Sequence, residues 1–314
     1  MAGFINALSA SAVLFLLMAV GYFMGRRGWA GENEKRFLNR FILNIAVPCN
    51  CVEGMLDNLK REELFRAWRL LLAAFLSVGL CLLLASLLAR LLNIPRERRG
   101  VFTAMTGLSN TIFIGIPVCL QLFGEKCMPY LMLYFLANTT FVQLAGIPLV
   151  AGSGNLGRRA PGAAGVLRAL ITSPPVLGVI AGIALLLLGL RLPAPIMQTV
   201  RYIGGSVTPL ALIYCGLIIY ELGLRNVHFQ RGMPTMLLVR LVAAPLICLF
   251  CCRLLGITGL ARDVFVVESG LPVVTQIVVM AGAYGADEKY AAAGLCLSTL
   301  GSFISIPVLS FLLQ

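Results

Sequence analysis

Long apolar stretches separated by short loops occupy almost the whole of this chain of 314 residues. The sequence is 59% hydrophobic and 12% charged, with a mean hydropathy of +0.93, and a soluble domain could not bury that much apolar surface. Each stretch has about 20 residues, the length of helix that crosses roughly 30 Å of hydrocarbon. The loops leave no room for a soluble catalytic or nucleic-acid-binding domain. We therefore predict an all-α polytopic membrane protein with ten transmembrane helices, at 6–24, 37–56, 68–92, 99–123, 129–151, 170–190, 196–221, 233–255, 263–284 and 290–312.

The net charge of +12 could indicate an anionic partner, but the positions of the basic residues favour another explanation. About 16 of the 25 lysines and arginines lie in or beside loops that follow odd-numbered spans, among them Arg26, Arg27 and Arg96. Such basic loops face the cytoplasm. We therefore expect a multi-pass protein of the cell membrane, in contact with the lipid bilayer, with both termini extracytoplasmic. No nucleic-acid partner is expected.

Residues that could carry catalysis are scarce. Most of the ten cysteines lie inside apolar spans, where cysteine acts as a small packing residue. Cys49 and Cys51 lack the spacing of a metal site, and the single histidine, His228, lies in a polar loop. The sequence contains neither an HExxH nor a Gly-x-Ser-x-Gly motif. We expect a protein that is not an enzyme and has no cofactor.

The two halves of the chain share a sequence pattern. Three segments of the first half resemble three segments of the second, with an offset that shifts slightly, as small loop deletions would cause. An odd number of spans in each half would insert the second half upside down relative to the first, as in many secondary transporters. We expect a first five-helix repeat at 1–151, a cytoplasmic linker at 152–168 and a second repeat at 169–314. The matched segments are LLNIPRERRGVF (91–102) with LLGITGLARDVF (254–265), FGEKCMPY (123–130) with YGADEKYA (284–291), and VQLAGIPLV (142–150) with SFISIPVLS (302–310).

Spans 4 and 9 occupy equivalent places in the two repeats, and both contain polar residues and a proline. Because proline has no N–H and clashes with the preceding turn, we expect Pro117 and Pro272 to interrupt these helices. Free helix N-termini inside the membrane would then offer donors and partial positive charge to an anion. The nearest basic residue, Arg240, is expected one or two turns from an interface. The alternative is a simple kink, with Asn110 and Thr111 bonded to a neighbouring helix.

Three motifs carry a resemblance to a known family. The segments NRFILNIAVPCN (39–50), SNTIFIGIPVCLQLFG (109–124) and SGLPVVTQIVVMAGAYG (269–285) resemble the span 2, span 4 and span 9 signatures of the auxin efflux carriers. That family belongs to the superfamily of the bile acid/sodium symporters. Plant members have a second proline where this chain has Ile277, and many have a long central loop that is short here.

The resemblance covers the whole chain and implies ten helices in which broken spans 4 and 9 cross. It also implies an elevator-like mechanism, with spans 3–5 and 8–10 moving against a scaffold of spans 1, 2, 6 and 7, and a homodimer formed through the scaffold. Known cargoes of the family are organic anions, which include auxins in plants and small carboxylates such as malonate or malate suggested for bacterial members. The candidate substrate-binding residues are Pro48, Asn110, Thr111, Gly115, Pro117, Pro272 and Val273.

Glu268 is the most deeply placed carboxylate, and such a group usually marks an ion or proton path. One hypothesis is a sodium site, slightly favoured because Glu268, Ser109, Asn110 and Gln276 resemble the ligand pattern of the bile acid/sodium branch, with Thr139 and Thr140 as further oxygen donors. The second hypothesis is a proton carrier. The third is a structural Glu268 that reaches the interface or pairs with a basic residue, either Arg262 or Arg99.

The leading functional hypothesis is a secondary active transporter of small organic anions, with the substrate at the crossing of spans 4 and 9. A channel is less consistent with paired interruptions in inverted repeats. A membrane receptor built on a transporter fold is the remaining alternative. The sequence names neither the substrate nor the direction of transport.

Overall fold

The chain folds into helices throughout the part that the computed structural model describes, residues 2–58, 67–156, 162–223 and 229–313. Within these ranges the backbone forms no strand, only one isolated bridge between Ser109 and Val273. His228 and the loop arginines Arg158 and Arg159 lie outside the described residues. The helices of the first half are α1 (Ala2–Arg26), α2 (Glu32–Phe41), η1 (Ile42–Ala46), α3 (Val47–Asn58), α5 (Ala67–Leu91), α6 (Arg96–Gly107), η2 (Thr111–Gly115), α7 (Ile116–Phe123), η3 (Glu125–Cys127), α8 (Met128–Phe141), η4 (Val142–Gly146) and α9 (Ile147–Ser153).

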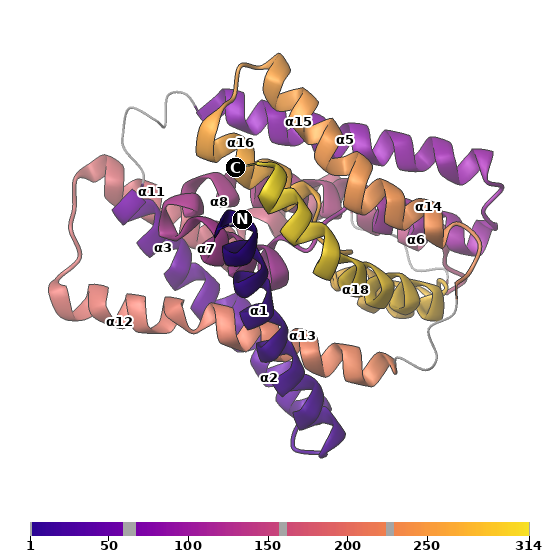
Figure 1. Cartoon of the computed structure of the whole chain (residues 1–314), viewed down its shortest axis with the longest axis horizontal. Helices are drawn as coiled ribbons and strands as arrows, with labels where there is room; N and C mark the ends of the chain where they lie inside the picture. The colour runs from indigo at the N-terminus through magenta and orange to yellow at the C-terminus, as the bar shows by residue number, and fades with distance from the viewer. Residues whose placement is uncertain (1, 59–66, 157–161, 224–228, 314) are drawn as a thin grey trace.

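The second half repeats this helical character (Figure 1). Five helical segments of the described chain are long and apolar enough to cross a membrane, or six if the pair 164–171 and 174–188, bent by 60°, is one span. The all-helical class is confirmed, whereas the ten spans and their inverted repeat stay predictions. The helices of the second half are α10 (Ala163–Ile171), α11 (Pro174–Leu188), α12 (Ala194–Gly205), α13 (Val207–Leu222), α14 (Met233–Leu238), η6 (Val239–Ala243), α15 (Ala244–Leu254), α16 (Gly259–Ser269), α17 (Gln276–Tyr284) and α18 (Glu288–Leu312).

Four prolines inside the helical segments share a local structure that differs from our expectation for Pro117, whereas Pro307 lies within α18 without it. Pro48, Pro117, Pro148 and Pro245 each stand second in an α-helix that directly follows a five-residue π-helical turn. A proline cannot donate to the ladder and its ring crowds the carbonyl four residues earlier, and the wider π turn relieves both problems. The expectation that Pro117 interrupts its span is therefore wrong: the helix continues through it.

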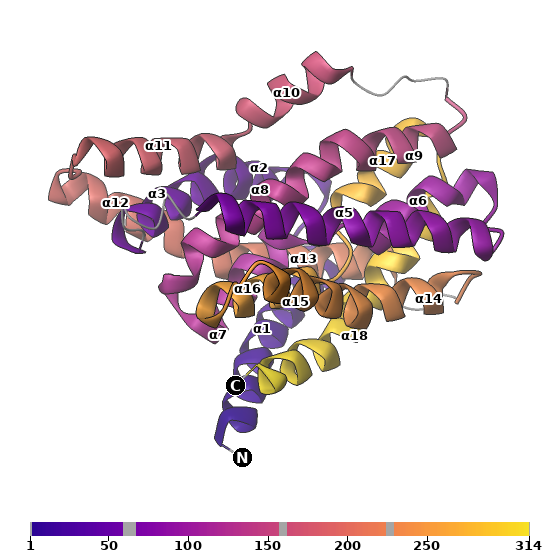
Figure 2. The same ribbon diagram turned by 90° about the horizontal axis from the view of Figure 1, so that it is seen from above.

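Helices α11 and α12 pack against α3 at one end of the molecule, whereas α6, which packs against α5, lies at the other end (Figures 1 and 2). Helix α5 also packs against α15. Helix α1 runs along α13. At their contact, a Cβ added to Gly216 would overlap the carbonyl oxygen of Met18, and a Cβ added to Gly21 would overlap the carbonyl oxygen of Ile213. Glycine on both helices therefore permits a backbone approach of the kind that small residues allow in membranes.

We expect Gly216→Ala to lower the free energy of unfolding by about 1–3 kcal/mol, the usual effect of overpacking. The reason is that α1 and α13 must separate to admit one methyl group. The measurement is thermal unfolding in detergent, and Gly205→Ala, on α12 with open space around its Cβ position, is the matched control. Equal melting temperatures for the two variants would contradict this close approach.

Candidate functional site

Two interrupted helical segments cross near the centre of the molecule. Helix α6 ends at Gly107 and helix α16 ends at Ser269, and the extended backbone that follows each of them meets in an antiparallel bridge between Ser109 and Val273. The Asn110 N–H donates to the Pro272 carbonyl over 2.9 Å. The interruption in the first segment thus precedes Pro117 by several residues, while that in the second includes Pro272 as expected.

Side chains from two other helices satisfy the backbone of this crossover. Asn138 of α8 accepts from the Ser109 N–H over 3.2 Å and donates to the Ser109 carbonyl over 2.9 Å. Ser298 of α18 accepts from the Val273 N–H over 3.1 Å. Both side chains are buried. Sequence reasoning missed both residues, although Asn138 stands directly before Thr139.

Asn110 connects the two halves of the crossover by its side chain as well. Its Oδ1 accepts from the Phe113 N–H over 3.2 Å, which caps the helical segment that starts at Thr111, and its Nδ2 donates to the Thr275 Oγ1 over 3.1 Å. Thr275 directly precedes α17. We call the helical segments before the two interruptions the first half-helices and those after them the second half-helices. The starts of both second half-helices are therefore joined through the Asn110 amide.

A cavity of about 370 Å³ adjoins these two helix starts. It includes four of the residues that the sequence predicted, Asn110, Thr111, Thr139 and Gln276, and several polar residues that it did not. This volume falls within the usual range for small-molecule sites. The full lining is Asn39, Leu43, Asn44, Asn110, Thr111, Ile112, Phe113, Phe135, Asn138, Thr139, Val142, Gln143, Ser173, Pro174, Pro175, Tyr214, Val274, Thr275, Gln276 and Val279.

Other predicted site residues lie outside this lining. The backbone of Pro48 faces Gly178 of α11, where it would meet an added Cβ. Thr140 donates to the Leu136 carbonyl of its own helix over 2.7 Å. Ser109, Pro272 and Val273 form the crossover itself.

A second, larger cavity of about 870 Å³ shares Asn39, Tyr214, Thr275 and Val279 with the first, so the two adjoin. We call it the vestibule. Its lining is rich in charge from α2, α13 and α18, and the full set is Glu32, Lys35, Arg36, Asn39, Tyr214, Ile218, Glu221, Thr275, Val278, Val279, Gly282, Ala283, Glu288, Lys289 and Ala292.

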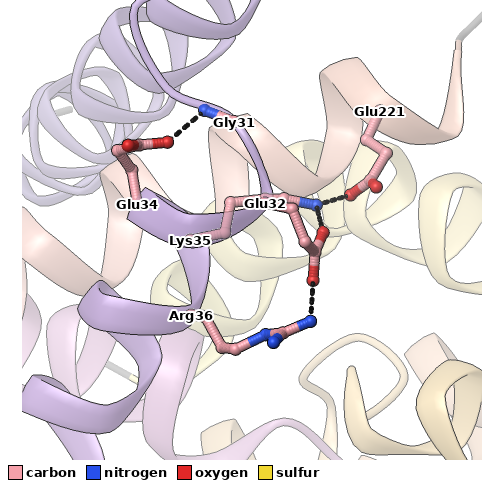
Figure 3. Close-up of polar contacts among 6 residues, drawn as sticks. All are labelled: Gly31, Glu32, Glu34, Lys35, Arg36 and Glu221. Atoms are coloured by element: carbon pink, nitrogen blue, oxygen red, sulfur yellow. Dashed lines mark hydrogen bonds and ion pairs between the residues drawn. The ribbon is translucent and has the colours of Figure 1, made fainter.

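Figure 3 shows the ion pairs at the rim of the vestibule. The Lys35 ammonium lies 2.8 Å from the Glu32 carboxylate and also contacts Glu221, while Arg36 lies 3.6 Å from Glu32. Partial burial lowers the pKa of Lys35, but the hydrogen bonds to Glu221 and Glu32 outweigh it and leave that pKa above its usual value. The hydrogen bond from Lys35 holds the pKa of Glu32 below its usual value. Lys35 and Glu32 therefore stay charged at neutral pH.

Glu268 is fully buried and lies against the other half of the crossover. The Cys119 thiol donates to its Oε1 over 3.3 Å, and its Oε2 has no hydrogen-bond partner. A Cβ on Gly115 would lie 2.5 Å from Oε1, so glycine at that position makes room for the carboxyl group.

The carboxyl group of Glu268 is buried and pairs with neither of the two arginines that were expected as partners. Arg262 pairs with Asp263 at 2.7 Å, and Arg99 donates to the Ile94 carbonyl over 3.3 Å.

The Arg240 side chain is buried, with 1% of its surface exposed. Its guanidinium donates to the Thr106 carbonyl over 3.1 Å and to the Ser269 carbonyl. These two carbonyls belong to the last turns of α6 and α16. A buried cation therefore lies at the two helix C-termini of the crossover, where the sequence predicted none.

The sequence of the chain that forms this crossover and cavity also matches a protein family. The family model described as membrane transport protein matches residues 7–155 and 163–310. The chain belongs to this family. The resemblance to the auxin efflux carriers is thereby confirmed, and with it a multi-pass membrane transport protein.

Relatives are similar over nearly their whole length. An "Uncharacterized transporter" of Methanocaldococcus jannaschii is 26% identical over 309 residues, which cover 96% of this chain and 97% of the relative. Another "Uncharacterized transporter", of Methanothermobacter thermautotrophicus, is 25% identical over 308 residues, covering 96% of each chain. A "Putative malonate transporter" of Rhizobium meliloti is 24% identical over 306 residues, covering 96% of this chain and 93% of the relative.

We expect Asn138→Leu to lower the free energy of unfolding by about 2–5 kcal/mol, because it leaves both the N–H and the carbonyl of Ser109 buried without a partner. The measurement is thermal or denaturant unfolding in detergent. Thr140→Val is the matched control, since this hydroxyl bonds only within its own helix. A loss for Asn138→Leu no larger than that of the control would show that the Ser109 backbone does not depend on the Asn138 amide.

Proposed function

We propose that this protein is a secondary active transporter of small organic anions, with the substrate held in the 370 Å³ cavity beside the crossover. The observation that carries this proposal is that the starts of both second half-helices, at Asn110–Phe113 and at Thr275–Gln276, line one cavity. Helix N-termini present free N–H donors and partial positive charge, which suit a carboxylate. A small dicarboxylate such as malonate, named for one relative, is the first compound to test.

The polar lining suits such a ligand. The amides of Asn39, Asn44, Gln143 and Gln276 can each donate to a carboxylate oxygen and accept from a hydroxyl group, and the Tyr214 hydroxyl can do the same. The vestibule adjoins this cavity, and the distribution of basic loops favours a cytoplasmic position for its rim at Lys35, Glu221 and Lys289. We propose that this conformation is open to the cytoplasm and that both termini are extracytoplasmic.

We further propose ten spans in two inverted repeats, at 1–151 and 169–314. In support, the extended backbone at the two interruptions is held in the same way: span 5 supplies Asn138 to Ser109, and span 10 supplies Ser298 to Val273. Matching partners at matching positions are what an inverted repeat would produce.

We propose an elevator-like movement because the cavity lies between two groups of helices. We call the helices of spans 1, 2, 6 and 7 the scaffold group and those of spans 3–5 and 8–10 the transport group. The cavity is lined from both, for example by Asn44 and Tyr214 of the scaffold group and by Asn110 and Gln276 of the transport group. A substrate between two groups can change sides when one slides past the other. The homodimer would form through the scaffold group.

We propose that transport is coupled to a cation at Glu268, because its carboxyl group is buried and one oxygen has no hydrogen-bond partner. An unpaired carboxylate inside a membrane usually serves an ion or proton path. Sodium, as a hard cation, needs several oxygen donors. Among the described residues, the hydrogen-bond partner of Glu268 is the Cys119 thiol, while Ser109 and Asn110 bond within the crossover. This donor set favours the proton over sodium as the coupling ion.

The central experiment is counterflow in liposomes loaded with unlabelled malonate. A carrier takes up labelled malonate in exchange, whereas a receptor binds it without uptake. If neither malonate nor any of a panel of mono- and dicarboxylates exchanges, the proposed function is wrong.

We expect Asn110→Ala to weaken binding or transport by about 1–3 kcal/mol, which is roughly five- to more than a hundredfold, because the amide that joins the two helix starts is lost. The measurement is the concentration dependence of malonate exchange. Asn110→Leu is made in parallel, with its melting temperature. Normal transport by a stable Asn110→Leu protein would exclude the crossover as the substrate site.

We expect Glu268→Gln, a neutral mimic of the protonated acid, to abolish uptake driven by a pH gradient while leaving exchange at equal pH. Flux is measured at fixed pH with sodium replaced by choline, then across a pH gradient without sodium. Glu97→Gln, an exposed carboxylate at the start of α6, is the control. Loss of wild-type flux on removing sodium would favour the metal instead, and unchanged accumulation by Glu268→Gln would place coupling elsewhere.

A further inference from the structure

The Arg240 side chain is the feature of the crossover that the proposed substrate site does not use. It is buried in the π-helical turn Val239–Ala243, and its Nε has no hydrogen-bond partner. Its terminal nitrogens donate to the carbonyls of Thr106 and Ser269, at the ends of α6 and α16. One guanidinium therefore binds the C-termini of both first half-helices.

The positive charge of Arg240 has no neutralising partner among the described residues. The ion pairs in this part of the chain join other arginines, such as Arg98 with Asp287 and Arg201 with Asp57, and do not include Arg240. The titratable groups that interact with it are Cys81, Tyr134 and Cys248. Thiols and phenols are neutral near pH 7 by their ordinary values. Among the described residues, the groups that compensate the charge are the dipoles of the two carbonyls.

The charges of the crossover can be added. Each helix N-terminus carries roughly half a positive charge and each C-terminus roughly half a negative charge. Four helix termini meet here: two N-termini, after Asn110 and Thr275, and two C-termini, near Thr106 and Ser269. Without Arg240, their partial charges add to about zero. The Arg240 guanidinium binds the two negative C-termini and offsets their partial charges. The positive partial charges of the two N-termini, which line the cavity, are then no longer balanced by the C-termini.

We propose that Arg240 determines charge specificity: it makes the cavity prefer dianions to monoanions, which narrows the substrate class to small dicarboxylates. This rests on the proposed function and deepens it. Arg240 does not line the cavity, so it acts through its field rather than by contact. A fixed charge interacts twice as strongly with a dianion as with a monoanion at the same place. Preference between two ligands that differ in one charge is therefore the property to measure.

The test compares malonate with its monoamide, malonamate, in equilibrium binding to the purified protein. Arg240→Gln removes the charge but keeps donors for the two carbonyls, and Arg240→Lys keeps the charge. Arg262→Met, which removes an arginine of α16 that pairs with Asp263, is the matched control. Melting temperatures are recorded for all variants, and Arg240→Met replaces Arg240→Gln if the latter does not fold.

We expect Arg240→Gln to weaken malonate binding by roughly tenfold and malonamate binding by roughly threefold, so that the preference falls by about threefold. Arg240→Lys and Arg262→Met should keep the wild-type preference. Equal weakening of both ligands in Arg240→Gln would mean that Arg240 only supports the fold, and an unchanged preference in every neutral variant would likewise overturn the inference. If the wild-type protein binds and exchanges dicarboxylates but does not prefer malonate to malonamate, this inference alone is refuted. If it binds neither compound and exchanges no carboxylate, the proposed function is refuted as well.

Discussion

A helix interrupted inside a membrane exposes backbone N–H and C=O groups where no water can satisfy them, and each must find a partner within the protein. In the crossover, three side chains supply such partners. Ser109 is held by Asn138, Val273 by Ser298, and the helix C-termini at Thr106 and Ser269 by the Arg240 guanidinium. The positions of α8, α18 and η6 around the crossover follow from this need, because each supplies one of these partners.

The sequence identified the two interrupted segments but not the residues at which they break. Polar residues and prolines at equivalent places pointed to spans 4 and 9, and the structure interrupts both. The expectation for Pro117 failed because a π-helical turn absorbs the proline without opening the helix, and hydropathy and proline position alone do not distinguish a π turn from a break. The interruption instead follows Gly107, and it is stabilised by the cap that Asn110 provides.

The side chains that support the crossover were harder to predict, because their roles depend on orientation. Neighbouring residues of a helix point about 100° apart, so Asn138, Thr139 and Thr140 make different contacts although all three are polar. Asn138 and Thr139 both line the cavity, but only Asn138 also binds the crossover, and Thr140 bonds to its own helix. The sequence placed Arg240 one or two turns from an interface but did not assign it a partner. Two carbonyls from segments far apart in the sequence stabilise it, and only the folded chain brings them together.

The distribution of polar contacts bears on how such a molecule could move. All of the hydrogen bonds that hold the crossover join helices of the transport group, as those between Asn110 and Thr275 and between Asn138 and Ser109 illustrate. The ion pairs among the described residues also stay within one group: Lys35 with Glu221 in the scaffold group, Arg98 with Asp287 in the transport group. Sliding one group past the other would therefore break none of these bonds. Opening the crossover itself would leave several buried groups unpaired, at about 1–3 kcal/mol each. Under the proposed function, this difference favours movement of the transport group as a rigid unit, with the substrate carried beside an intact crossover.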